Sequence, residues 1–542
     1  MRKSVTCKLL GAVLAAAMVF SMTACSSGSS SAASSSAASS SASSSTASSS
    51  STVTKADSLT IAMSADPSTL EPMIQSGQAV RLIKMCMYRG LLAYQADGKV
   101  GYEIASSYEV AADNITYTFH IRSDAKFHDG SDITAADVKF SFERQMDTSV
   151  SATFAKDFSN MIDHITVVDN KTVQFVLKQA CAPFIDYLTL PEAVVVSESW
   201  CKAHNNDLNA NPMGSGPYVF GSWDKGRQIT VTAFDKFYKT GKPETKELDF
   251  VITTDVTARV NALQSGEADL IDYVSATAAT ALEKDKNYTV DVSEGPFMCL
   301  QINCTSGPLA DARVRQAIAY AINRQGVIDT AFNGRGHELF GFPTTDGQNG
   351  YDGKYDNYYS YNIEKAKALL KEAGYENGFD VTILATSTYD FHKQTALVVQ
   401  DSLKAIGINA SVDLPDWSTR ITRSNTGDYQ ILVSGTAGNI VDMDWCTNYF
   451  ESGETRMNSA PGFSDATVDS LLAEGRQTLD ATKRAEIYDQ LRARILELSP
   501  FVFINWREQI FATTSDVKGF VNLPGILTYN SGITLEDTYK TK

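Results

Sequence analysis

The chain lacks the local signatures of the common catalytic sites. Its 542 residues contain no G-x-S-x-G nucleophile elbow, no H-E-x-x-H zinc motif and no glycine-rich loop ending in Gly-Lys-Ser/Thr. Only six histidines occur, and those beyond residue 130 stand apart from one another: His164, His204, His337 and His392. The sequence therefore predicts that the protein is not an enzyme, although a triad assembled from remote residues stays an open alternative.

Cysteine is scarce and is not arranged for metal binding. Beyond residue 25 no two cysteines form a C-x-x-C pair, so no metal site is predicted and no cofactor is expected. His128 beside Asp129 is an isolated pair that supplies too few ligands for a metal. Free thiols and disulfides both stay open, with fifteen complete pairings possible among Cys86, Cys181, Cys201, Cys299, Cys304 and Cys446.

Positive charge is also sparse beyond the N-terminal leader. Without residues 1–24 the chain has 44 Lys and Arg against 63 Asp and Glu, a formal charge of −19, and no basic block remains. Nucleic acid is therefore not an expected partner. Beyond Phe20 no apolar run is long enough to cross a bilayer.

The N-terminus carries an export signal. A basic start at Arg2, Lys3 and Lys8 precedes an apolar run over residues 9–20, which is too short for a spanning helix. The following residues 22–25, Met-Thr-Ala-Cys, resemble a bacterial lipobox. The resemblance implies that residues 1–24 are a lipoprotein signal peptide and that Cys25 is lipidated.

A tether follows the proposed anchor. Residues 26–51 contain only Ser, Ala, Thr and one Gly, a composition that cannot bury a core. We therefore interpret residues 25–54 as a lipidated Cys with a flexible tether. At roughly 5–6 Å times the square root of its length, it would hold a globular body about 30 Å from the membrane.

Strands and helices alternate through the remaining chain. The alternation at residues 116–121 predicts a half-buried strand, and two β-rich runs around residues 169–171 predict a hairpin. Between them, Thr134 and Asp137 form a capping pair that predicts a helix. This part is α+β in character.

The later part has longer helices followed by strands. The patterns predict helices over residues 363–373 and 393–406, ending at Gly374 and Gly407, and an extended run at residues 412–414. A helix that starts at Asp480 is stopped by Pro500. The helix-then-strand order predicts a second α/β lobe with partly parallel strands.

Five blocks resemble one known family. They are residues 66–72, 121–144, 214–218, 259–269 and 311–324. Together they are similar to the bacterial extracellular solute-binding proteins of the oligopeptide, dipeptide and nickel family, which supply ABC importers. The blocks occur in the expected order over nearly all of the chain beyond the tether.

The resemblance implies a mixed α/β, two-lobed, hinged fold of the periplasmic-binding-protein type. Lobe I would comprise residues 55–92, 213–302 and 501–542, with an inserted subdomain at 93–212, and lobe II residues 303–500. It also implies a monomer that captures a peptide or small molecule between the lobes. An ABC permease with its ATPase subunits would receive the solute at the outer face of the bacterial cytoplasmic membrane.

In the resembling family, three stretches line the ligand cleft. The first runs here from Gln75 to Gln78, where backbone groups can pair with an extended ligand. The second begins at Trp417 and continues along residues 435–445, and the third contains Asn505 and Trp506. The resulting candidate ligand residues are Gln75, Ser76, Gly77, Gln78, Trp417, Gly435, Thr436, Asn439, Asp442, Trp445, Asn505 and Trp506.

One departure from the family pattern concerns the ligand. Peptide binders of this family present an Asp that pairs with the ligand's α-ammonium group, and Asn439 occupies that position here. An amide does not supply the charge-assisted bond that a buried ammonium requires. Either Asp442 takes over or the ligand is not a free-amine peptide. A peptide remains the expected ligand, and the alternatives are an oligosaccharide, a chelated metal or, in another class, a surface hydrolase.

Overall fold

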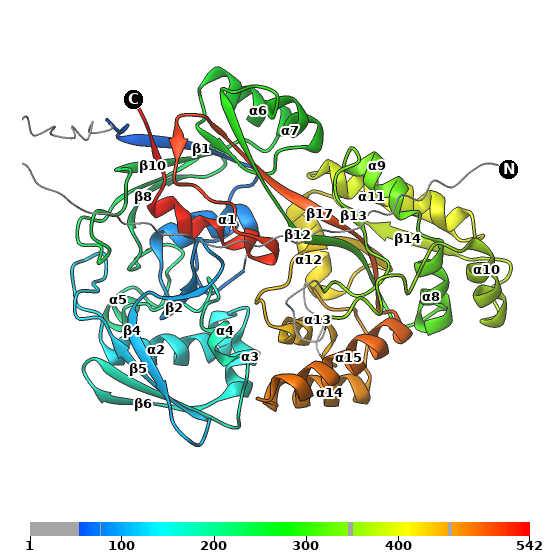
Figure 1. The fold of residues 1–542 in the computed structure, drawn as a ribbon, viewed down its shortest axis with the longest axis horizontal. Helices are drawn as coiled ribbons and strands as arrows, with labels where there is room; N and C mark the ends of the chain where they lie inside the picture. Colours follow the sequence, from blue (N-terminus) through cyan, green and yellow to red (C-terminus); the bar gives the residue numbers. More distant parts are fainter. Residues whose placement is uncertain (1–53, 76, 345–350, 454–457) are drawn as a thin grey trace, which may run out of the picture. The chain divides into compact units, whose positions relative to one another are not determined.

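The computed structural model describes residues 54–75, 77–344, 351–453 and 458–542. Within them the largest sheet has eleven strands, in the order β15-β14-β16-β12-β17-β11-β1-β10-β9-β8, with β13 paired to β17 (Figure 1). Its strands are β1 (Ser58–Met63), β8 (Tyr218–Asp224), β9 (Gln228–Ala233), β10 (Glu247–Ile252), β11 (Leu270–Ile271), β12 (Tyr288–Ile302), β13 (His337–Glu338), β14 (Asp380–Leu384), β15 (Asn409–Asp413), β16 (Ile431–Thr436) and β17 (Phe501–Thr514).

The long antiparallel strands β12 and β17 belong to both halves of this sheet. They pair from Tyr288 opposite Thr514 to Gln301 opposite Phe501, and the register shifts near Glu294. On one side β17 pairs with β11, and on the other β12 pairs with β16. We call the part around β1 and β8–β11 lobe I and the part around β14–β16 lobe II; β12 and β17 run side by side between them (Figure 1).

Lobe I combines parallel and antiparallel strands with a few helices. Its strand β1 is parallel to both β10 and β11, and its interior is apolar. The additional elements are α1 (Gln78–Met87), β2 (Leu92–Tyr94), β3 (Val100–Tyr102), α6 (Val256–Ser265), α7 (Ala276–Leu282), β18 (Val517–Lys518), η4 (Gly525–Glu536) and β19 (Tyr539–Lys540).

A separate four-stranded antiparallel sheet lies within residues 93–212, in the order β4-β5-β7-β6. The predicted strand is β5, and the predicted hairpin is formed by β6 and β7, so both predictions are confirmed. The capping pair is also confirmed, because Thr134 and Asp137 close a capping box on α2. The elements are β4 (Ala105–Val110), β5 (Thr116–Ile121), α2 (Ala135–Met146), η1 (Thr148–Val150), α3 (Ala155–Met161), β6 (Ile162–Asp169), β7 (Thr172–Leu177), α4 (Phe184–Tyr187) and α5 (Glu198–Ala203).

Lobe II has the predicted parallel strands, because β14 runs parallel to both β15 and β16. The predicted ends at Gly374 and Gly407 are confirmed, since both glycines have positive φ just beyond their helices. The helices are η2 (Pro308–Ala310), α8 (Ala312–Ala321), α9 (Arg324–Ala331), α10 (Ile363–Glu372), α11 (Asp390–Lys404), α12 (Trp417–Thr426), η3 (Met443–Cys446), α13 (Thr447–Phe450), α14 (Ala466–Gln477) and α15 (Ala481–Leu498). Helix α11 begins three residues before the predicted start.

Some sequence features have structural roles. Gly214 and Gly216 are buried against α1, where an added Cβ would lie 2.1 Å and 2.4 Å from the carbonyl oxygens of Met87 and Cys86. The six cysteines are unbridged, which resolves the alternatives for the thiols. Within the described residues, none of the helices has both the length and the apolar character that crossing a bilayer requires.

Candidate ligand-binding site

A cavity of about 70 Å³ lies between lobe I and lobe II, and we call it the first cavity. Lobe I contributes the segment before α1, α1 itself and Tyr529 of η4. Lobe II contributes the start of α11, the helix α12 and the end of β16. The lining residues are Gln75, Gly77, Arg81, Tyr273, Tyr389, Phe391, His392, Trp417, Arg420, Ser434, Gly435, Thr436, Gly438, Asn439, Asn458, Arg507 and Tyr529.

The position of the first cavity follows from the strand directions in lobe II. Strands β14 and β16 are parallel, so their carboxyl ends lie at the same edge of the sheet. The segment beyond β14 supplies Tyr389 and Phe391, and the end of β16 supplies Gly435 and Thr436. Ligand sites in open α/β sheets form at such an edge.

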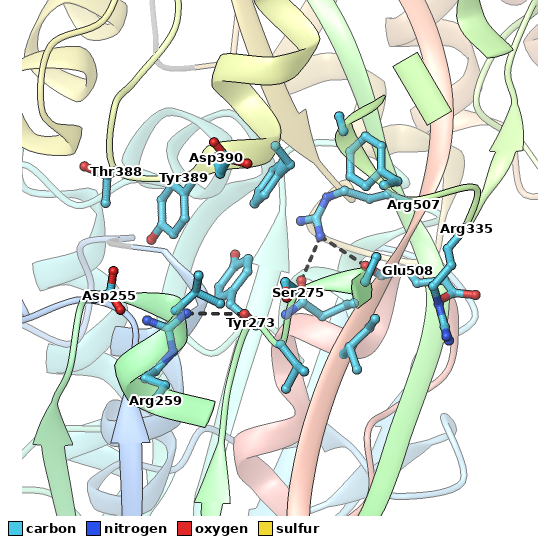
Figure 2. Close-up of a pocket in the computed structure, with 18 of the residues that line it drawn as sticks. Asp255, Arg259, Tyr273, Ser275, Arg335, Thr388, Tyr389, Asp390, Arg507 and Glu508 are labelled. Atoms are coloured by element: carbon cyan, nitrogen blue, oxygen red, sulfur yellow. Dashed lines mark hydrogen bonds and ion pairs between the residues drawn. The ribbon is translucent and has the colours of Figure 1, made fainter. Parts of the chain in front are cut away.

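A second cavity of about 270 Å³ adjoins the first. Four residues line both: Tyr273, Tyr389, Phe391 and Arg507. The rings of Tyr273 and Tyr389 lie 5.4 Å apart, centre to centre, and form an aromatic wall. Figure 2 shows this wall from the second cavity, which also carries the charged side chains of Asp255, Arg259, Arg335, Asp390 and Glu508.

The predicted stretch before α1 reaches the first cavity. Gly77 is the N-cap of α1 with φ 93°, a conformation that favours glycine. The Nε2 group of Gln75 donates a hydrogen bond of 3.0 Å to Oδ1 of Asn439 in lobe II. Gln78 is buried and donates to the carbonyl oxygen of Thr528 instead of lining the cavity. Ser76 lies outside the described residues.

Four predicted residues of lobe II also line the first cavity: Trp417, Gly435, Thr436 and Asn439. Trp417 begins α12 and meets Tyr389 edge-on, with ring centres 5.0 Å apart. The hydroxyl groups of Thr436 and Tyr449 share a hydrogen bond of 2.6 Å. These contacts fix the side chains that a ligand would meet.

The structure places Asp442 away from this lining. Its carboxylate pairs with Arg484, and Asp442 is absent from both cavities described above. In the same segment Trp445 is buried, with its ring 5.7 Å from that of Phe342.

The predicted third stretch lies beside the site and not in it. Asn505 is fully buried on β17, and its Nδ2 donates to the carbonyl oxygen of Trp506 at 2.9 Å. The indole of Trp506 packs edge-on against Phe297. Neither residue lines the first or the second cavity.

Sequence reasoning missed several lining residues, above all Tyr273, Tyr389, Arg420, Arg507 and Tyr529. Tyr389 could have been found, because it follows a strand whose carboxyl end points to this edge. The others lie on separate elements of both lobes and are brought together only by folding.

Burial governs the electrostatics of the first cavity. His392 is buried, and its burial together with the neighbouring Arg420 and Arg507 guanidinium groups lowers its pKa well below the ordinary value. It is therefore neutral near pH 7. Burial likewise lowers the pKa of Arg420, to about 10, which leaves this guanidinium charged.

The described part of the chain holds no group of three or more His, Cys, Asp or Glu side chains placed to bind a metal ion. His128 is buried with its Nε2 3.1 Å from the carbonyl oxygen of Gly216, and burial lowers its pKa to about 4. It thus packs against the segment at residues 214–218.

Comparison with known proteins identifies the class. The family described as bacterial extracellular solute-binding proteins, family 5, matches residues 99–458. The chain belongs to this family, whose members work with an ABC permease and its ATPase components, and it is a substrate-binding protein of an ABC importer. The resemblance and the two-lobed fold are thereby confirmed, as is export from the cytoplasm.

Three relatives illustrate the likeness. The chain is 45% identical to the binding protein AgaA of A. tumefaciens R10, solved with agropinic acid, with a TM-score of 0.86 over 90% of this chain and 99% of that one. It is 27% identical to the glutathione-binding protein GsiB of Pectobacterium atrosepticum, over 88% of this chain and 93% of the relative. It is 29% identical to the dipeptide-binding protein of Escherichia coli, over 86% and 92%.

Proposed function

We propose that the protein captures a small peptide or peptide-related solute in the first cavity and delivers it to the membrane permease. The observation that carries this proposal is that residues of both lobes line the first cavity, so that a bound solute would contact both lobes. Its relatives include a glutathione-binding protein and a dipeptide-binding protein. Binding alone, without a chemical step, is sufficient for this role.

The hinge in this proposal is formed by β12 and β17. These strands join the lobes, and their register shifts where one half of the sheet passes into the other. Bulges of this kind bend a strand and allow it to twist locally. Ligand bound in the first cavity contacts both lobes and favours the closed arrangement through its higher affinity for that state.

The proposed domain boundaries and site residues fit this mechanism. Lobe I would comprise residues 55–92, 213–302 and 501–542, with the subdomain at 93–212 inserted, and lobe II residues 303–500. Among the candidate ligand residues we retain those that line the first cavity, namely Gln75, Gly77, Trp417, Gly435, Thr436 and Asn439.

The proposed location is the outer face of the cytoplasmic membrane. Cys25 would carry the lipid and residues 25–54 would act as the tether; residues 1–53 lie outside the described residues. We propose a monomer, since one chain already supplies both walls of the first cavity.

A non-peptide solute is the second candidate, and one observation favours it. The relative solved with agropinic acid is 45% identical over 90% of this chain. In this variant of the proposal the importer role and the first cavity are unchanged, and only the ligand differs.

Thermal unfolding with a ligand panel tests the proposed function. The panel contains dipeptides, glutathione, agropinic acid, maltose and a nickel–histidine chelate. A ligand of the native state raises the melting temperature with concentration, following RT ln(1 + [L]/Kd), and small-angle scattering should report compaction. Absence of both effects for every compound, with turnover of a peptide or ester, would favour the surface hydrolase.

A further inference from the structure

Two buried arginines line the first cavity without an acidic partner. Arg420 and Arg507 are 1% and 3% exposed. Arg420 donates to the carbonyl oxygen of Val433 and to Oγ of Ser434, at 3.1 and 3.2 Å. Arg507 donates to Oε1 of Gln509 and to the hydroxyl of Tyr529, at 2.9 and 2.8 Å. The Nε atoms of both arginines have no hydrogen-bond partner.

Several other buried arginines of this chain are paired with carboxylates. Arg144 pairs with Glu71, Arg476 with Asp444, and Arg81, which also lines the first cavity, with Glu192. Within the described residues, no Asp or Glu lies within ion-pair distance of Arg420 or Arg507, and none lines the first cavity. Two unneutralised buried charges therefore face one small space, which is costly unless a ligand supplies the opposite charge.

Arg324 is a useful contrast, because it is equally buried and also has no carboxylate in an ion pair. Its guanidinium donates to four carbonyl oxygens, those of Leu339, Phe503, Ala319 and Tyr359, and its Nε is satisfied. Arg324 lines neither cavity. Arg324 therefore has a carbonyl oxygen for its Nε although it has no carboxylate in an ion pair, whereas the Nε atoms of Arg420 and Arg507 have no acceptor.

Gly435 lines the first cavity directly beside Arg507 and His392. A Cβ built on Gly435 would lie 3.6 Å from Nε of Arg507 and 3.6 Å from Nε2 of His392. The Nδ1 of His392 lies 3.3 Å from the carbonyl oxygen of Val433, to which it donates in the neutral ring. A side chain at residue 435 would therefore contact both Arg507 and His392, which line the first cavity.

The lining of the first cavity offers no carboxylate that could pair with a positively charged ligand group. Asn439 supplies an amide that is already bonded to Gln75, and the Asp442 carboxylate is paired with Arg484. A buried ammonium group requires a carboxylate or several acceptors. The lining thus favours an anion and disfavours a cation.

We propose that the ligand is a small solute whose carboxylate binds Arg420 and Arg507 and whose amino group is blocked or absent. Guanidinium groups pair with carboxylates through strong, charge-assisted hydrogen bonds. Both arginines line the first cavity, and each has an Nε–H group that lacks an acceptor. This inference rests on the proposed function, since it names the class of solute that the first cavity takes.

A matched set of compounds tests the charge requirement on the unaltered protein. The set is dialanine, N-acetyl-dialanine, the methyl ester of N-acetyl-dialanine, and dialanine amide, with agropinic acid as a further acid. We expect N-acetyl-dialanine or agropinic acid to bind, with the ester at least about tenfold weaker than its acid and the amide cation weaker than the ester. Equal affinity for acid and ester, or preference for the cation, would overturn the inference.

Two variants test the residues themselves. In Arg507→Gln and Arg420→Gln, the preference for the acid over its ester should fall towards unity. Arg324→Gln is the matched control, a buried arginine outside the cavity, and should keep the wild-type preference even if it lowers stability. This ratio does not depend on overall stability, so an unchanged ratio in both cavity variants would contradict the assignment. If a variant does not fold, the compound series decides alone.

The failure of this inference can be told apart from failure of the proposed function. A neutral binder such as maltose, or a cationic one, would overturn the anionic ligand while leaving the importer role intact. Complete lack of binding in the wider panel would overturn both.

Discussion

Gln75 donates a hydrogen bond of 3.0 Å from its Nε2 to Oδ1 of Asn439, and this bond joins residues 364 positions apart in the chain. Gln75 belongs to lobe I and Asn439 to lobe II, and both line the first cavity. The contact therefore occupies the position where an acidic side chain could meet a ligand ammonium group. Where the family pattern has an aspartate for the ligand, this chain has Asn439, whose side-chain oxygen accepts a hydrogen bond from Gln75.

Asn439→Asp should change which charge the first cavity accepts. The aspartate keeps an acceptor for Gln75 and adds a negative charge beside the ligand space. Dialanine amide should gain about tenfold in affinity, near 1.4 kcal/mol, while N-acetyl-dialanine should lose a similar amount. Calorimetric titration of both compounds against both proteins measures this, and parallel changes for the two compounds would contradict it.

Gly435→Ala should weaken ligand binding more than it weakens the fold. The new Cβ would lie 2.9 Å from Sδ of Met298, a flexible side chain, and 3.6 Å from Nε of Arg507. Overpacking of this kind destabilises by roughly 1–3 kcal/mol. Unfolding in denaturant should show a loss in this range, whereas the ligand-induced rise in melting temperature should largely disappear. Retention of the full rise would show that this space is not used.

Asp186 should make stability depend on pH. Burial raises the pKa of its carboxyl to about 6, and the hydroxyl of Tyr94 donates to its Oδ1 at 2.6 Å. The protonated form is favoured in the native state, so this contribution is complete below about pH 4 and is lost as pH rises through 6. The difference amounts to roughly 3 kcal/mol.

Asp186→Asn tests that expectation. The amide does not titrate, so the variant should lose this decline in stability between about pH 4 and 6, relative to the wild type. Denaturant unfolding at several pH values measures the difference. Parallel pH profiles for the two proteins would show that another group is responsible.

Cys25→Ser should release the protein from the membrane fraction. The expected lipid needs the thiol, and the Ser/Ala tether has too few apolar residues to contribute to the core. The melting temperature should stay unchanged, which serves as the control for folding. A serine variant that still partitions with membranes would refute the lipoprotein proposal.

The sequence by itself determined the local elements and the family. Alternation of apolar residues specified β5, and the pairing of Thr134 with Asp137 specified the start of α2. Such signals depend on neighbours within a few residues, so they can be read without knowledge of the fold. The resemblance of five sequence blocks to one family likewise indicated the two-lobed architecture.

Only the tertiary structure decided which side chains meet in the first cavity. Folding pairs Asp442 with Arg484. It also places Arg420 of α12 and Arg507 of β17 in the lining of the first cavity. The strand order of the main sheet, in which β12 and β17 lie between β16 and β11, creates that neighbourhood. The sign of charge that a site prefers depends on which buried groups remain unpaired, and pairing between distant segments is set by packing and not by local sequence.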